Sequence, residues 1–219
     1  MTTKTMKTAV IGTGRMGVKL AGMLAGHLPA GSLLWASRDK AKAAALIAER
    51  GLSIEPASHE EALNAADILI PALWHQDQTA WLPSHQAAIH GKIVINITNP
   101  FNAAFDDFTT DYNTSSAEEL QKLAPGARFV GAFKNTFWEV LSEPERHGLK
   151  SDVFVTSDDE EAKRTVMSML QGLPFRFLDG GRLANNRTIE RMTLFSRELA
   201  KRYGTYPLVS WRLWGLGDE

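Results

Sequence analysis

The sequence contains no cysteine among its 219 residues. This absence excludes disulfide bonds, thiolate metal ligands and a cysteine nucleophile, and it favours a reducing compartment such as the cytoplasm. No apolar run approaches the roughly 18 residues that a membrane-spanning helix needs, and the first residues lack the apolar core of a signal peptide. We therefore expect a cytoplasmic protein without a membrane partner.

An excess of charge of one sign is also lacking, because 24 Lys and Arg residues stand against 25 Asp and Glu residues. A balanced surface creates no strong field for nucleic acid, so no nucleic acid partner is expected. His27, His59 and His147 have no partners at metal-ligand spacing, and His85 and His90 are expected to face solvent. No metal site is predicted.

Short apolar runs alternate regularly with helical patterns along the chain. Strands are expected at residues 7–12, 32–37, 67–73, 91–98, 127–134, 152–157 and 174–179. Helices are expected at 16–28, 39–50, 58–66, 76–90, 116–124 and 158–171, with a helix and turn over 135–150 and mainly helix from residue 180 onward. Runs that are apolar on both faces and alternate with helices predict a doubly wound parallel sheet, an α/β fold.

Three glycines separate the first expected strand from the first expected helix, in the stretch "IGTGRMG". In this context Gly12 permits a sharp turn, Gly14 lets a pyrophosphate approach the backbone, and Gly17 lets the helix pack on the strand. The amides and the dipole at the start of the helix favour a phosphate. The loop therefore predicts a dinucleotide site, and a plain tight turn is the alternative.

The end of the second strand indicates which dinucleotide binds. An NAD site expects an acidic residue there, whereas this sequence has Ser37 and Arg38, with Lys40 and Lys42 at the start of the next helix. A guanidinium and a hydroxyl suit a 2′-phosphate. NADP is therefore predicted, although a one-residue shift would place Asp39 on the ribose and favour NAD.

A longer series of motifs then follows in order: "ASRDKAKA", "KIVINITNPFN", "SSAEELQKL", "GAFKNT" and "LDGGRLANNRTIERMT". With the glycine loop, this series resembles the F420-dependent NADP oxidoreductases, and it is similar to the reductase domains of metalloreductases. The resemblance implies a Rossmann domain over residues 1–180 and a small C-terminal helical region over 181–219, in a homodimer. It also implies hydride transfer between NADPH and a deazaflavin.

The resemblance implies a set of cofactor contacts, position by position. They are Gly12, Thr13, Gly14, Arg15, Met16 and Gly17 at the pyrophosphate, Ser37 and Arg38 at the 2′-phosphate, Ala72, Leu73 and Trp74 along the nicotinamide, and Ala132 and Phe133 beside the ring. One stretch departs from the family, which tends to have Lys-Ala-Phe-Asn-Thr. Here Lys134 is interposed after Phe133, so we expect a reshaped wall of the acceptor pocket.

His75 is the candidate catalytic residue, because it directly follows the strand end "PALW" at the crevice where such sheets bind ligands. It could protonate an acceptor nitrogen or bind a phosphate. A surface or helix-capping histidine is the alternative. Trp74 and Trp138 each follow a strand end within a few residues, so both are expected near a flat substrate.

Four polar residues begin the helix after "LDGG", namely Asn185, Asn186, Arg187 and Glu190. They could reach the active-site cleft or a partner subunit. Alternatively, Glu190 forms a surface charge pattern with Arg187 or Arg191 within the helix. The tail "SWRLWG" is expected to dock, because exposed indoles are otherwise unfavourable.

These features together predict an NADPH-dependent oxidoreductase that moves a hydride to or from a planar acceptor. The acceptor could be deazaflavin F420, a flavin, or a small imine or carbonyl compound. Hydride transfer between two rings needs close stacking rather than a protein acid or base. A non-catalytic NADP-binding sensor is the alternative from another class.

Overall fold

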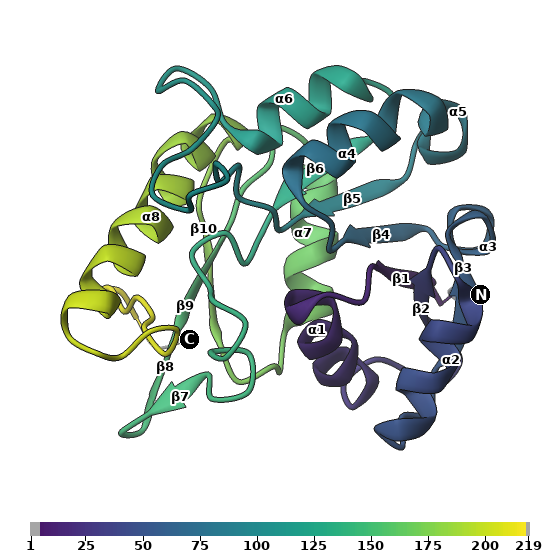
Figure 1. Cartoon of the computed structure of the whole chain (residues 1–219), viewed down its shortest axis with the longest axis horizontal. Coiled ribbons are helices and arrows are strands. Elements are labelled where there is room, and N and C mark those ends of the chain that lie inside the picture. The colour runs from purple at the N-terminus through teal and green to yellow at the C-terminus, as the bar shows by residue number, and fades with distance from the viewer. Residues whose placement is uncertain (1–4, 218–219) are drawn as a thin grey trace.

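A six-stranded sheet forms the centre of the computed structural model, which describes residues 5–217 (Figure 1). Its strands lie in the order β3-β2-β1-β4-β5-β6, and every neighbouring pair is parallel. The strands are β1 (Thr8–Ile11), β2 (Leu33–Ser37), β3 (Glu55–Ser58), β4 (Ile68–Pro71), β5 (Ile93–Asn96) and β6 (Arg128–Gly131). This order is that of a Rossmann fold, which confirms the predicted doubly wound sheet.

Helices cover both faces of the sheet. Figure 1 shows α1 and α2 on one side of the sheet and α4, α5 and α6 on the other. The helices are α1 (Arg15–Ala25), α2 (Lys40–Glu49), α3 (His59–Ala65), α4 (His75–Trp81), α5 (Gln86–Ile89), α6 (Ser116–Leu123), α7 (Glu160–Leu170) and α8 (Asn186–Arg202), with 3₁₀ turns η1 (Leu82–His85) and η2 (Leu183–Asn185). Ser58 and Glu61 form a capping box at the start of α3.

Successive residues of each strand belong to two different cores. Val10 packs with α1 and α7, whereas its neighbours Ala9 and Ile11 pack with α3 and α6. Side chains of a strand point alternately to opposite faces, so strands that are apolar throughout need a helical layer on each side. This two-sided burial explains why the hydrophobic runs identified the parallel sheet.

A second, smaller parallel pair extends the fold beyond β6. It consists of β9 (Asp152–Val155) and β10 (Arg176–Asp179), and an antiparallel bridge joins Gly131 to Thr156. In Figure 1, α8 lies on the side of β9 and β10, away from the β3 edge of the main sheet. The C-terminal helix α8 therefore lies toward the β6 edge of the main sheet.

Three expected helical stretches differ in the structure. The helix expected over 76–90 is divided into α4, η1 and α5, because Pro83 lacks the N–H that a continuous helix needs. The stretch 135–150 contains turns and the two short strands β7 (Glu145–Arg146) and β8 (Leu149–Lys150) instead of a helix. Residues 203–217 are turns and irregular chain rather than helix.

The irregular tail is fixed by a buried ion pair. Arg176 Nε lies 2.7 Å from Asp152 Oδ1, and the same guanidinium donates to the carbonyls of Leu213, Leu216 and Gly217. Trp211 donates its indole N–H to Ser196 on α8. The expected docking of the tail is therefore confirmed for Trp211. Trp214, by contrast, is 78% exposed. No helix within residues 5–217 is both long and apolar enough to cross a bilayer.

Candidate active site

The glycine loop connects β1 to α1, and two of its glycines are required by close packing. Gly12 has φ of +117°, and a Cβ there would lie 2.6 Å from the carbonyl oxygen of Ala72. A Cβ on Gly17 would lie 2.2 Å from the carbonyl oxygen of Gly12. Only glycine fits at either position. Gly12 makes the turn after β1, and Gly17 lets α1 pack closely on the strands, as the sequence predicted for both residues.

The surroundings of Gly14 fit a phosphate group. A Cβ added at Gly14 would meet no atom within 4 Å, so the backbone is open on that side. Gly14 is the N-cap of α1 without a side-chain hydrogen bond, and the first helical bond runs from Val18 N–H to its carbonyl. The preceding amides therefore lack intrahelical partners and, with the helix dipole, suit an anion.

Three cations, Arg38, Lys40 and Lys42, lie just after β2 and in the first turn of α2. Asp39 is used locally, because its side chain accepts a hydrogen bond of 2.9 Å from Ala41 N as the cap of α2. The exposed Lys40 is 2.7 Å from Glu61. Within residues 5–217, neither Arg38 nor Lys42 has such an acidic partner. This arrangement fits a 2′-phosphate better than a bare ribose hydroxyl.

A pocket of about 320 Å³ opens beside the glycine loop. It is bounded by the loop and α1, by the ends of β4 and β5, by the chain after β6, and by α8 and the tail. The lining residues are Gly14, Arg15, Met16, Ala72, Leu73, Trp74, Ile97, Thr98, Asn99, Phe101, Phe105, Thr136, Phe137, Trp138, Thr193, Arg197 and Tyr206. Ligands of doubly wound sheets bind at this carboxyl edge of the strands.

Aromatic side chains form two walls of this pocket. On one wall, Trp74 and Phe105 meet edge to face with their ring centres 5.6 Å apart. On the other, Trp138 and Tyr206 also meet edge to face at 5.6 Å, and the Arg15 guanidinium lies 4.1 Å from the Trp138 ring. Trp74 and Trp138 therefore line the same pocket, and a flat substrate beside them stays a prediction.

The structure brings only some of the predicted site residues into the pocket. Gly14, Arg15 and Met16 of the loop line it, and so do Ala72, Leu73 and Trp74 after β4. Ala132 and Phe133 do not line it. Both are buried, and Phe133 packs against Phe175 and Phe177 in the core. The wall at this point is instead formed by Thr136, Phe137 and Trp138, three to five residues further along the chain.

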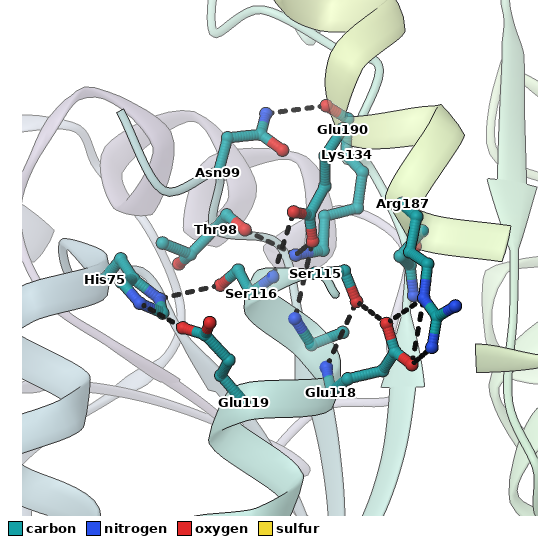
Figure 2. Close-up of polar contacts among 12 residues, drawn as sticks. His75, Thr98, Asn99, Ser115, Ser116, Glu118, Glu119, Lys134, Arg187 and Glu190 are labelled. Carbon is teal, nitrogen blue, oxygen red and sulfur yellow. Dashed lines mark hydrogen bonds and ion pairs between the residues drawn. The ribbon is translucent and has the colours of Figure 1, made fainter. Parts of the chain in front are cut away.

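His75 is the first residue of α4 and turns toward α6 instead of the pocket (Figure 2). Its Nδ1 lies 2.9 Å from Ser116 Oγ, and its Nε2 lies 3.2 Å from Glu119 Oε2. Burial, and then the charge of Lys134, lower the pKa of His75, and the charge of Glu190 opposes them. The residue is buried, so the alternative of a surface histidine is excluded.

Lys134 and Glu190 form a buried ion pair beneath the pocket. Figure 2 shows the two side chains pointing toward each other between the main fold and α8, with Lys134 Nζ 2.7 Å from Glu190 Oε1. Lys134 also donates to the carbonyl of Thr98, and Glu190 accepts from the amides of Ser116 and Ala117. Burial lowers the pKa of Lys134, and the charge of Glu190 opposes that effect.

This ion pair corrects two expectations. Lys134 is wholly buried and does not line the pocket, so it does not reshape the wall directly. Glu190 belongs to no surface charge pattern, because it pairs with Lys134, while Arg187 pairs with Glu118 at 2.5 Å. Sequence spacing could not show this, since Lys134 and Glu190 lie 56 positions apart.

The remaining polar residues at the start of α8 serve the fold. Asn186 is buried and donates to Thr156 Oγ1 over 2.8 Å. Asn185 is exposed and donates to the carbonyl of Gly180. Neither lines the pocket.

The doubly wound sheet and the open glycine loop define a dinucleotide-binding protein of the Rossmann class. The family model "NADP oxidoreductase coenzyme F420-dependent" matches residues 7–100. The F420-dependent NADP reductase of Methanothermobacter marburgensis is 31% identical over 203 residues, which cover 86% of this chain and 89% of the relative. The chain belongs to the F420-dependent NADP oxidoreductase family, and it is an NADP-dependent oxidoreductase.

Two further comparisons agree with this assignment. Metalloreductase STEAP3 of Rattus norvegicus is 28% identical over 86% of this chain, which spans 36% of that protein. A solved protein of Arthrobacter sp. FB24, provisionally named an F420-dependent NADP reductase, superposes with a TM-score of 0.81 at 24% identity, covering 91% of this chain and 96% of that one. The latter comparison supports the shared fold.

Proposed function

We propose that the pocket receives a planar hydride acceptor, deazaflavin F420 or a flavin, against the nicotinamide of NADPH. The observation that carries this proposal is the continuity of the aromatic pocket with the glycine loop: Gly14 and Trp138 line the same cavity. A flat ring system matches the flat faces of Trp74 and Trp138. The F420-dependent reductase of M. marburgensis supports the same class of acceptor.

NADPH supplies a hydride when bound, and the protein's task is to hold two rings together and exclude water. We assign the pyrophosphate to the backbone of Gly12–Gly17, including Thr13, Arg15 and Met16, and the 2′-phosphate to Ser37, Arg38 and Lys42. Ala72, Leu73 and Trp74 would position the nicotinamide. Ala132 does not line the pocket, so it would support the site only by packing beneath it.

A direct proton-transfer role for His75 has less support. Within the described chain, the pocket lining contains no histidine and no carboxylate, and the His75 ring is engaged by Ser116 and Glu119. Hydride transfer to a ring acceptor does not require such a group at the reacting atoms. His75 would then influence the site by holding α6 against α4.

The first experiment is an anaerobic assay of NADPH absorbance with F420 and with FMN as acceptors. Turnover with either one supports the proposal. NADPH binding without reduction of any planar acceptor would overturn it. The Trp74→Ala variant is expected to raise the KM for the acceptor at least tenfold, because it removes one aromatic wall, while the Kd for NADPH changes less.

A small imine or carbonyl compound is the second candidate acceptor. Hydroxyl groups of Tyr206 and Thr136 belong to pocket-lining residues and could donate a proton to such a substrate. An imine reductase of Aspergillus terreus shares the fold with a TM-score of 0.59 at 23% identity. A cyclic imine in the same assay separates the two candidates, because only this reaction should depend on the Tyr206 hydroxyl.

Three further expectations stay predictions. They are the homodimer, the cytoplasmic location, and the division of the chain into residues 1–180 and 181–219. Sedimentation of the purified chain would test the first, and limited proteolysis near residue 180 would test the third.

A further inference from the structure

Among the described residues, the charged side chains that line the pocket are all cationic. Its lining includes the guanidinium groups of Arg15 and Arg197 but no Asp or Glu among the described residues. Arg197 is half-buried, and within residues 5–217 it makes no hydrogen bond or ion pair. A partly desolvated cation without a counter-charge is unfavourable in the free protein, so this arrangement favours an anionic ligand.

The two arginines come from different helices, and each lies against one ring of the wall formed by Trp138 and Tyr206. Arg15 begins α1 in the glycine loop and stacks on Trp138, so the pyrophosphate of the cofactor accounts for its charge. Arg197 is on α8, one helical turn after the lining residue Thr193. Its guanidinium carbon is 5.9 Å from the centre of the Tyr206 ring, at the end of the aromatic wall.

We propose that Arg197 determines acceptor specificity by binding an anionic group, a phosphate or carboxylate, carried on the side chain of the planar acceptor. This inference rests on the proposed planar acceptor, and it adds that the acceptor carries a negative charge. The ring would lie between the aromatic walls, and the anionic group would meet the guanidinium beside Tyr206. A charge-assisted hydrogen bond of this kind is stronger than a neutral one.

FMN and riboflavin provide a matched test, because they share one ring system and differ by a phosphate. Their Kd values are measured by flavin fluorescence with protein saturated with NADP⁺, so that no reaction occurs. We expect FMN to bind the wild-type protein roughly tenfold or more tightly than riboflavin. F420 and its deazaflavin core without phosphate form a second pair for the same measurement.

Arg197→Met should bring the ratio of the two Kd values close to one, whereas Arg197→Lys should retain part of the preference. Arg202→Met is the matched control, because Arg202 is on the same helix but exposed and paired with Glu198 at 2.8 Å. It should keep the wild-type ratio. High salt should reduce the preference of the wild type.

Each other outcome has a defined meaning. A ratio near one in the wild type, or one that Arg197→Met leaves unchanged, overturns the role of Arg197 while the planar acceptor stands. A loss of NADPH affinity in Arg197→Met with an unchanged ratio would assign the cation to the cofactor instead, and it also overturns the proposal. If neither pair binds, the planar acceptor fails and this inference fails with it.

Discussion

Two regions of this protein treat charge in opposite ways. Beneath the pocket, Lys134 and Glu190 are withdrawn from water and satisfy each other, and Glu190 also receives backbone amides of α6. Around the pocket and at the end of β2, Arg38 and Arg197 have no carboxylate partners within the described chain. Paired buried charges hold elements together, whereas cations without counter-charges indicate where an anionic ligand binds.

The largest effect is expected from breaking the buried pair. Lys134→Met should lower the free energy of unfolding by about 3–5 kcal/mol, because it leaves Glu190 buried without a counter-charge. Urea unfolding measures the loss. Lys40→Met is the matched control, since Lys40 and Glu61 are also 2.7 Å apart but about half exposed. That exposed pair should contribute less than about 1 kcal/mol. Equal losses would show that burial does not distinguish the two pairs.

A substitution in the glycine loop should weaken cofactor binding and leave the stability of the fold nearly unchanged. Gly14→Val adds a side chain where no protein atom lies within 4 Å of the new Cβ, but it occupies the approach of the pyrophosphate. We expect the Kd for both NADPH and NADH to rise at least a hundredfold, while the urea midpoint shifts little. Calorimetric titration checks this, and tight binding by the variant would exclude the assigned loop role.

The cations at the end of β2 should distinguish the two cofactors. Arg38→Ala removes a charge that would meet the 2′-phosphate, and we expect a loss on the order of 1–3 kcal/mol in NADPH binding. NADH binding should change much less. Lys40→Ala is the control, because Lys40 is already paired with Glu61. Equal losses for both cofactors in Arg38→Ala would contradict the NADP-specific role.

A smaller effect concerns the pH dependence of stability. The pKa of His75 is lowered from its ordinary value of 6.5 by burial and by the charge of Lys134. The unfolded chain therefore takes up this proton first, so the contribution of neutral His75 is present above about pH 6.5 and is lost as the pH falls below it. His75→Gln should flatten the stability profile between pH 7 and 5. An unchanged slope would mean that His75 is not held neutral.

Local patterns predicted the cofactor side of the molecule better than the acceptor side. The glycine spacing and the alternating strands depend on residues that are close in sequence, and each is present in the structure. The buried pair joins Lys134 to Glu190 across 56 positions. The pocket likewise needs Tyr206 from the tail to meet Trp138. No local spacing contains such contacts.

The departure at Lys134 illustrates this limit in physical terms. The interposed lysine departs from the family's motif beside the acceptor pocket, and a lysine is rarely buried unless it is paired, so the sequence predicts a reshaped pocket wall. Here Phe133 has a φ of +54°, and the following residue, Lys134, is wholly buried outside the pocket lining. The charge is then stabilised by Glu190 from a helix that the local sequence could not place.

The most direct test of the account is hydride transfer from NADPH labelled with deuterium at the transferable C4 position. The acceptor should be a 5-deazaflavin, because the carbon that receives the hydride does not exchange it with water. We predict that deuterium appears in the reduced deazaflavin and that NADP⁺ forms in equal amount. NADPH that binds tightly but transfers no label to this acceptor would contradict the assignment of the pocket to a planar hydride acceptor.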